Sequence, residues 1–368
     1  MVNLKVNMWL EALIALIKAV VFLSCVLTLT SLLTWMERKQ SAVMQDRLGA
    51  NRAPILGIRA WGLPHILADA LKMFFKEDYV PPGGDKLLHT AAPFAALFFA
   101  LMSFAAIPFG DAIMVAGRKV ELQVFPLNVG LLFILAMMSM GIYGVFLAGF
   151  SSNNKFAFLG GLRASSQMIS YEITMGATLV GLLMIFGTMD LAELNRAQGD
   201  LLWGWLPKWG IFLQPVGFIL FLVAGVAETK RIPFDLPEGE SEIIGYFVEY
   251  SSMKFGAFFM TDFVETILIA ALISTLFFGG WQVPYLQSNG FSFPWGSSIS
   301  LSHVTVTLMQ VISFGLKVVF FCWFLLLIRW TLPRFRYDQL MHLGWKILLP
   351  ISVVNIFVTG FILILLRR

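Results

Sequence analysis

The stretch PLNVGLLFILAMMSMGIYGVFLAGF, residues 126–150, contains no charged side chain. A membrane-spanning helix needs about 20 mostly apolar residues, so this stretch predicts a helix that crosses a lipid bilayer. Seven further stretches meet the same criterion, at about 9–35, 87–110, 165–189, 211–228, 250–280, 304–330 and 345–366. The sequence therefore predicts an all-α polytopic membrane protein with about eight transmembrane helices.

The composition of the whole chain agrees with this prediction. Of its 368 residues, 58% are hydrophobic and 13% are charged, whereas soluble domains carry about 25% charged residues. No long polar block is present that would form a soluble domain. We therefore expect a single integral membrane domain over residues 1–368.

One further segment, about residues 57–76, has a different pattern. Its apolar residues recur at helical spacing, and charged residues lie between them: Ile58, Trp61, Ile66, Ala70, Met73 and Phe74 alternate with Arg59, Asp69, Lys72 and Lys76. This pattern predicts an amphipathic helix that lies at the membrane interface. A helix packed on a soluble neighbour would show the same pattern and remains the alternative.

The distribution of lysine and arginine predicts the orientation. Basic residues are concentrated in the first loop and recur in the third, fifth and seventh loops, while the loop over residues 282–302 has none. Because positively charged loops stay on the cytoplasmic side, we expect the odd-numbered loops there. With eight crossings, both chain ends lie on the opposite side.

A run of carboxylates marks the boundary between the fifth and sixth predicted spans. The segment ETKRIPFDLPEGESEIIGYFVEY, residues 228–250, holds Glu228, Asp235, Glu238, Glu240, Glu242 and Glu249 against two basic residues, Lys230 and Arg231. If the segment folds back into the protein, its acids are partly desolvated and titrate as a coupled set, as the entrance of a proton relay requires. A solvated cytoplasmic loop is the alternative, and the residues alone leave both open.

Ionisable residues also occur inside the predicted spans: Glu11, Lys18, Glu172, Asp262, Glu265 and Lys317. A charge near the middle of a bilayer costs about 2.5–3.5 kcal/mol on the translocon scale, so such residues usually face the bundle interior or an aqueous cavity. Glu172 lies among glycine and serine residues that allow close helix packing. Together with the loop acids, it suggests a polar path that enters the membrane.

The first loop begins with a dense polar patch where the first span ends. The patch contains Glu37, Arg38, Lys39, Gln45, Asp46, Arg47, Asn51 and Arg52. Positive-inside anchoring explains several of these residues, and the mixture with glutamine and asparagine suggests a docking surface for partners. An apolar slot between the amphipathic helix and the first span would suit a lipid-tailed ligand.

Cysteine and histidine residues argue against a cofactor bound by this chain. Cys25 and Cys322 both lie in apolar stretches without a CxxC partner, so we expect neither an iron–sulfur cluster nor a structural zinc site. The four histidines do not face one another from the middle of spans, as a membrane haem would require. We expect no metal site, no redox cofactor and no nucleic-acid partner.

Five motifs resemble one known family. They are ERKQSAVMQDRLGANR at 37–52, GIYGVFLAGFSSNNKFAFLGGLRASSQMISYEI at 141–173, PFDLPEGESE at 233–242, VEYSSM at 248–253 and TLPRFRYDQLMHLGWKILLP at 331–350. They resemble the H-type membrane subunit of proton-pumping NADH:quinone oxidoreductase, respiratory complex I, the family of the mitochondrially encoded first membrane subunit. The resemblance extends from about residue 9 to about residue 360.

The resemblance implies an eight-span component of the bacterial plasma (inner) membrane that couples reduction of a quinone such as ubiquinone to proton translocation. It implies partners: soluble subunits at the quinone site and the terminal iron–sulfur cluster, antiporter-like membrane subunits, and FMN held elsewhere in the complex. By motif, Arg38, Asp69, Lys72 and Arg231 fall near the quinone passage. Likewise, Glu172, Glu228, Asp235, Glu238, Glu240, Glu242 and Glu249 fall on an acidic relay. On this basis the chain carries no catalytic residue of its own, and the relay is favoured over the solvated loop.

The chain departs from the family pattern at three places. His65 stands where glutamine is usual, and the segment IIGYFVEY, residues 243–250, is one residue shorter than usual. In the sixth span, Asp262 stands where glutamate is common and Glu265 where asparagine is common. The sequence offers no explanation for the extra acid at Glu265.

Two alternative functions remain open from the sequence. The chain would also fit the equivalent component of a membrane-bound hydrogenase or of a ferredoxin-oxidising complex, because the electron donor binds elsewhere. A stand-alone ion transporter fits the acids inside the spans. It is disfavoured because the sequence shows no internal repeat and carries a large docking patch.

Overall fold

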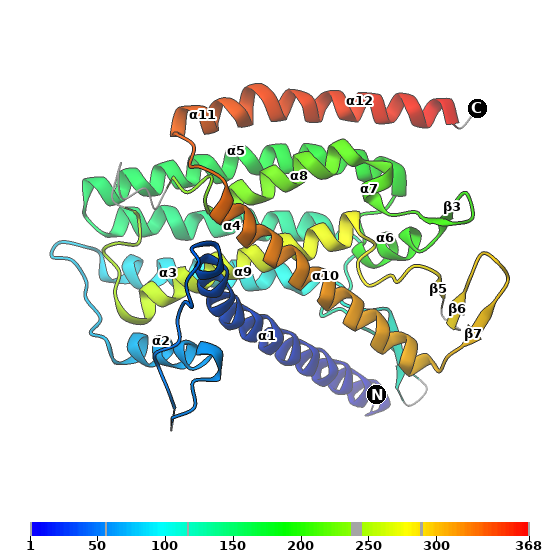
Figure 1. Ribbon diagram of the computed structural model, residues 1–368, viewed down its shortest axis with the longest axis horizontal. Coiled ribbons are helices and arrows are strands. Elements are labelled where there is room, and N and C mark those ends of the chain that lie inside the picture. The colour runs from blue at the N-terminus through cyan, green and yellow to red at the C-terminus, as the bar shows by residue number, and fades with distance from the viewer. Residues whose placement is uncertain (1, 56, 116–117, 237–244, 288–289, 367–368) are drawn as a thin grey trace.

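Long apolar helices run side by side through most of the chain (Figure 1). The computed structural model describes residues 2–55, 57–115, 118–236, 245–287 and 290–366. Within these residues, seven helical segments are long and apolar enough to cross a membrane. They are α1 (Val2–Met44), α3 (Lys86–Ser103) with the 3₁₀ turn Phe104–Ala106, α4 (Gly130–Ser151), α5 (Lys155–Phe186), α9 (Ser252–Phe277), α10 (His303–Thr331), and α11 (Tyr337–His342) with α12 (Leu349–Leu366). The predicted polytopic helical fold is thus confirmed.

The predicted span at 211–228 is interrupted. The structure has a short helix α7 (Gly210–Leu213) and a longer helix α8 (Pro215–Glu228), separated by Gln214, whose φ and ψ of −137° and 61° are not helical. At 1.5 Å per residue, α8 alone is about 21 Å long, shorter than the hydrocarbon core of about 30 Å. The two chain ends nevertheless lie at the same end of the bundle (Figure 1). An even number of crossings requires this placement, which supports α7 and α8 as the eighth.

Other boundaries also differ from the sequence-based prediction. Helix α5 begins at Lys155 rather than near residue 165, because the Asn154 side chain accepts a hydrogen bond from the Phe156 amide and caps the helix there. The last span begins earlier than expected, since α11 continues into α12 through a π-helical turn, Leu343–Leu348. These helices therefore extend beyond the apolar core that the sequence pattern identifies.

The predicted amphipathic segment at 57–76 is helical over a shorter range. A 3₁₀ turn (Ala60–Gly62) precedes helix α2 (Pro64–Phe75), which has no buried residue in the chain by itself. Leu67, Leu71 and Phe74 are exposed. This apolar face is open to either a membrane surface or a partner subunit, the two alternatives that the sequence leaves.

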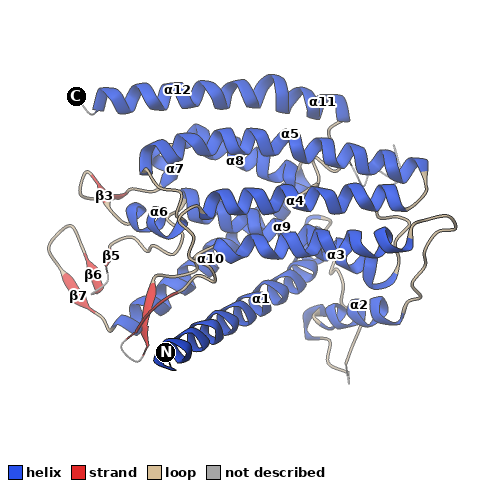
Figure 2. Cartoon of the chain, turned by 180° about the vertical axis from the view of Figure 1, so that it is seen from behind, coloured by secondary structure: helices blue, strands red, loops and turns tan. Residues whose placement is uncertain are grey.

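Short β-hairpins occupy the end of the bundle that holds both termini (Figure 2). The antiparallel pairs are β1 (Ala112–Val115) with β2 (Arg118–Glu121) and β3 (Leu201–Leu202) with β4 (Leu206–Pro207), and a three-stranded sheet has the order β5 (Leu286–Gln287), β6 (Gly290–Ser292) and β7 (Ser298–Ser300). The short helix α6 (Leu191–Gln198) lies with them. The sequence analysis did not predict these small strands, since they contain only two to four residues each.

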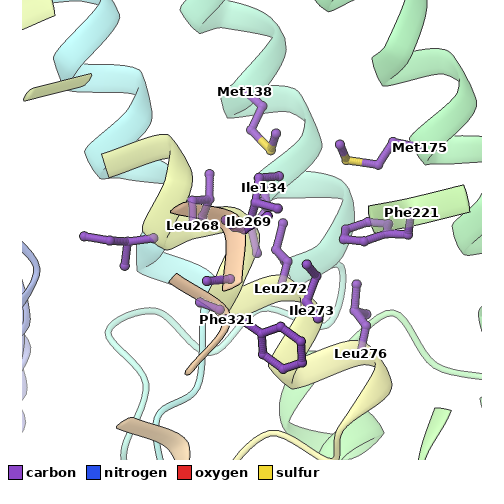
Figure 3. Packing of buried hydrophobic residues seen from close by; sticks show 14 of the residues in the cluster. Ile134, Met138, Met175, Phe221, Leu268, Ile269, Leu272, Ile273, Leu276 and Phe321 are labelled. Carbon is purple, nitrogen blue, oxygen red and sulfur yellow. The ribbon is translucent and has the colours of Figure 1, made fainter. Parts of the chain in front are cut away.

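Helix α9 forms the centre of the bundle. Its side chains are buried without interruption from Phe263 to Phe277, as expected for a helix that is apolar all round. Figure 3 shows Leu268 and Leu272 of α9 in the cluster with Met138 of α4 and Phe221 of α8. Glu265, a charged residue in this stretch of α9, therefore lies in the most buried part of the molecule.

Small residues let the neighbouring helices approach closely. A Cβ atom added at Gly144 of α4 would lie 2.7 Å from the backbone nitrogen of Ala96 in α3. In the same way, the Cα atoms of Gly149 in α4 and Gly161 in α5 meet across their helix interface. Such small-residue contacts are the usual way in which membrane helices pack.

Candidate functional site

Three of the predicted quinone-passage residues surround one pocket. It lies between α1, α2 and α9, has a volume of about 230 Å³, and is lined by Arg38, Asp69, Lys72, Met73, Lys76, Ser252, Phe255 and Phe259. We call it the α1–α2–α9 pocket. A guanidinium nitrogen of Arg38 lies 2.6 Å from a carboxylate oxygen of Asp69, and both side chains are about 40% exposed. The pocket thus combines an ion pair with apolar walls from Met73, Phe255 and Phe259.

Arg231, the fourth predicted residue, does not line this pocket but is connected to it by aromatic side chains. Phe259 packs edge-on against Phe263, with ring centroids 5.1 Å apart. The guanidinium of Arg231 lies over the Phe263 ring, 3.9 Å from its centroid. Arg231 also pairs with Glu37 of α1 at 3.2 Å, and the second oxygen of Glu37 lies 2.7 Å from Arg329 of α10. Glu37 therefore joins three segments of the chain at the inner side of the pocket.

The loop after α8 is folded back into the protein. Residues 228–236 are buried except for Ile232, which is half-buried. The Gln167 side chain on α5 donates hydrogen bonds to the carbonyls of Ala227, at 2.7 Å, and Phe234, at 2.8 Å. On the other side, the amide of Phe335 donates to the carbonyl of Pro233. In its described part, this loop is not the solvated loop that the sequence left possible.

Lys230 brings a positive charge to two acids of α9. Its ammonium nitrogen lies 3.1 Å from a carboxylate oxygen of Asp262 and 3.1 Å from one of Glu265. Lys230 has a φ of 53°, a left-handed conformation that residues other than glycine seldom adopt. Burial alone would lower the pKa of Lys230, but the neighbouring carboxylates, Glu265 foremost, raise that pKa well above its ordinary value. Lys230 is therefore a buried cation fixed by two carboxylates.

Glu228 lies beside this group with its carboxylate unpartnered. The side chain is 1% exposed, and neither carboxylate oxygen has a hydrogen-bond partner among the described residues. Glu228 and Glu265 line the same narrow cavity, of about 10 Å³, together with apolar residues of α3, α4, α5 and α9. Glu228 is also close enough to Glu172 for the two charges to interact. Because a cavity of this size accommodates about one water molecule, it provides a polar space between the carboxyl groups.

Glu172 lies near the middle of α5, inside its membrane-spanning part. The hydroxyl of Ser139 in α4 donates a hydrogen bond to its carboxylate. Glu228 is near enough to Lys230, Glu265 and Glu172 for their charges to interact, and Arg231 follows Lys230 in the chain. We call these groups, together with Asp262, the buried charge route.

The remaining predicted relay residues lie apart from this route or outside the described residues. Asp235 is buried, and Arg334 contacts it, donating a hydrogen bond to its carbonyl. Glu249 accepts a hydrogen bond of 2.6 Å from Asn154, at the start of α5. Glu238, Glu240 and Glu242, like the start of the shortened segment IIGYFVEY, lie outside the described residues.

Tyr250, the residue after Glu249, forms a buried aromatic contact. The hydroxyl of Tyr250 lies 2.9 Å from that of Ser151, and its ring stacks on His89 at 3.9 Å. Burial raises the pKa of Tyr250 to about 12, so this phenol stays neutral across the physiological range.

A second pocket lies on the far side of Arg38. It has a volume of about 360 Å³ and is lined by Arg38, Ser41, Arg47, Gly49, Ala50, Asn51, Arg52 and His65. The His65 ring nitrogen Nε2 accepts hydrogen bonds from the amides of Arg52, at 3.1 Å, and Ala53, at 3.3 Å. His65 therefore holds the end of the first-loop patch against α2, a role that a glutamine side chain oxygen would also serve.

Several members of the buried charge route were not among the site residues predicted from sequence. The sequence identified Asp262 and Glu265 as charges inside a span but did not connect them with Lys230. Their spacing of three residues places both on one face of a helix, which is the signal for a shared cation. The pairing of Glu37 with Arg231 and Arg329 joins residues far apart in the chain, and no local pattern indicates it.

Comparisons with known proteins identify the family of the chain. The profile of the NADH dehydrogenase family (NADHdh) matches residues 17–360. An H-type subunit of NADH-quinone oxidoreductase from Cytophaga hutchinsonii is 42% identical over 94% of this chain and 94% of its own length. The H-type subunit from Flavobacterium psychrophilum is 43% identical over 91% and 92%, and one from Geobacter metallireducens is 43% identical over 97% and 98%. The chain therefore belongs to the NADH dehydrogenase family, as a multi-pass membrane subunit of the NADH-quinone oxidoreductase H type.

Proposed function

We propose that this subunit forms the membrane side of the quinone-access chamber and passes the energy of quinone reduction to a proton path. The observation that carries the proposal is the arrangement of the buried charge route. Arg231 stacks on Phe263, whose ring packs against Phe259 in the wall of the α1–α2–α9 pocket, and Glu172 lies within α5 near Glu228. A structural ion pair would not need to extend from a pocket into the bundle.

The α1–α2–α9 pocket suits part of a quinone. Its apolar walls fit an isoprenoid chain, and the Arg38–Asp69 pair and Lys72 supply polar contacts near the aqueous side. Its volume of about 230 Å³ is below the range of about 300–1,000 Å³ that encloses a drug-sized ligand. The soluble partner subunits of the complex would therefore complete the chamber and hold the quinone headgroup near the terminal iron–sulfur cluster.

The coupling rests on electrostatics rather than on chemistry by this chain. Reduction of the quinone changes the charge near Arg231, and this change is felt by the neighbouring ionisable groups in turn. In a buried site such interactions are only weakly screened. A shift of one pKa unit corresponds to about 1.4 kcal/mol, so a few coupled carboxyl groups can store part of the driving force.

Replacement of Glu172 tests the inner end of this path. In the assembled complex reconstituted into liposomes, Glu172→Gln should reduce both NADH-driven quinone reduction and proton pumping, because the amide keeps the bond to Ser139 but carries no transferable proton. Glu193→Gln is a matched control, since Glu193 lies exposed on α6 and bonds to Thr188. Unchanged turnover with unchanged pumping in Glu172→Gln would remove Glu172 from the path.

A further inference from the structure

Glu265 is an acid buried within α9, and the structure shows which group it contacts. One carboxylate oxygen lies 3.1 Å from the Lys230 ammonium nitrogen, and the other accepts a hydrogen bond from it at 3.4 Å. Asp262, one helical turn earlier on α9, lies 3.1 Å from the same nitrogen. Lys230 is thus shared between two carboxylates on one face of α9.

Glu228 is left without a cation. Among the described residues it forms no ion pair, its side chain is 1% exposed, neither carboxylate oxygen has a hydrogen-bond partner, and it lines the narrow cavity that Glu265 also lines. An ionised carboxylate in this position would be buried without compensation, which is costly enough that the group instead keeps a proton.

We propose that Glu265 engages Lys230 as a second counter-charge and thereby keeps Glu228 in its protonated form, ready to supply a proton to the path. This inference rests on the proposed function, because it assigns Glu228 as the proton-carrying member of the buried charge route. It gives Glu265 the role of a positioning residue that acts through Lys230. A chain with asparagine at this position would leave Lys230 with one carboxylate and freer to pair with Glu228.

Two other carboxyl groups, those of Glu172 and Asp262, also favour the protonated form of Glu228. Glu172 on α5 adds a further negative neighbour to Glu228. Asp262 also forms an ion pair with Lys230. Arg231 is committed to Glu37 and to the Phe263 ring, and the Tyr246 phenol lies near Lys230. Helices α3 and α4 contribute apolar side chains and a glycine to the cavity wall.

The pH profile of the assembled complex in liposomes tests this role. In Glu265→Gln and Glu265→Asn, the Lys230 ammonium should be free to stabilise ionised Glu228. The fall of coupled quinone reduction at alkaline pH should therefore begin about one pH unit lower than in the wild type, because a close opposite charge lowers the pKa of a carboxyl group by about 1–3 units. Glu265→Asp retains the charge and should restore the wild-type profile, and Glu193→Gln should not alter it. Because asparagine has the shorter side chain, Glu265→Asn serves where the glutamine variant does not assemble.

A double variant separates this inference from a general disturbance. In a Glu228→Gln background, Glu265→Asn should cause no further shift of the profile, since the group through which it acts is gone. Superimposable profiles of wild type and Glu265→Asn would overturn the inference, as would an equal shift in Glu265→Asp. If Glu172→Gln and Glu228→Gln lose pumping while Glu265→Asn matches the wild type, this inference fails and the proposed function stands. If neither glutamine variant has an effect, the proposed function itself fails.

Discussion

The carboxylate of Glu37 on α1 bridges two arginines, lying 3.2 Å from Arg231 and 2.7 Å from Arg329. All three side chains are at most 19% exposed. Removing the shared carboxylate leaves two buried cations facing each other, and breaking a buried pair costs about 3–5 kcal/mol. Glu37→Gln should therefore lower the thermal unfolding temperature of the complex and its yield on purification. Glu193→Gln provides the control, and equal unfolding temperatures for the two variants would show that the bridge contributes nothing.

The Arg38–Asp69 pair should behave differently, because both side chains are about 40% exposed. An exposed ion pair contributes about 0–1 kcal/mol to stability. We expect Arg38→Gln to leave the unfolding temperature nearly unchanged but to raise the KM for quinone about tenfold, the effect of losing one polar contact worth about 1.4 kcal/mol. Lys119→Gln, on the opposite side of the bundle, is the matched control. A variant that lowers kcat at an unchanged KM would place Arg38 outside the quinone passage.

Lys230 leads to a prediction about pH. The carboxylates around it raise its pKa well above the ordinary value of about 10.4. When folding raises the pKa of a basic group, the group contributes its full stabilisation at any pH below the pKa that it has in the unfolded chain. This stabilisation is lost only as pH rises through the pKa that the group has in the folded protein. The wild-type complex should thus keep this pairing as pH rises from 8 to 10.

Lys230→Gln provides the comparison for that prediction. Without the ammonium group, Asp262 and Glu265 face each other unpaired, so the variant should be less stable than the wild type at neutral pH. Its stability deficit should shrink at pH 5, where protonation of the acids relieves their repulsion. Unfolding temperatures measured at pH 5, 7 and 9 would show this trend. A deficit that does not change with pH would indicate a packing defect instead.

Gln167 should hold the loop after α8 in place. Its side chain donates to the carbonyls of Ala227 and Phe234, and each such hydrogen bond contributes about 0.5–1.5 kcal/mol net to stability. Gln167→Leu should therefore increase amide hydrogen exchange over residues 229–236 and reduce quinone reduction. Gln310→Leu removes a comparable buried amide side chain, which accepts from Asp111 near the other end of the bundle. Equal exchange in the loop for both variants would contradict this role of Gln167.

The helical bundle could be predicted from the sequence because lipid imposes a simple rule. Each crossing needs a long apolar stretch, and stretches such as residues 126–150 contain no charge at all. The ends of the helices depend on finer chemistry. Asn154 caps α5 ten residues before the expected start, and Pro215 together with Gln214 divides the expected span at 211–228. Side-chain capping and backbone breaks are local features that the apolar pattern does not record.

The candidate site could also be predicted only in part from the sequence. Motifs identified Glu228 and Glu172 because they lie in recognisable segments, and the structure shows that residues 228–236 are buried or half-buried rather than solvated. The contacts of Lys230 with Asp262 and Glu265 were missed, since they join segments that the chain brings together only when α9 packs against the loop after α8. Periodicity within one helix cannot identify a partner on another segment.

In the proposed function, the buried carboxyl of Glu228 carries a proton between the quinone side and the bundle interior. The most direct measurement is the number of protons pumped per NADH oxidised, together with the rate of quinone reduction, by the complex carrying Glu228→Gln in liposomes. We expect the proton yield and the rate of quinone reduction each to fall at least tenfold relative to wild type and to Glu193→Gln. Wild-type turnover with a full proton yield in Glu228→Gln would contradict it.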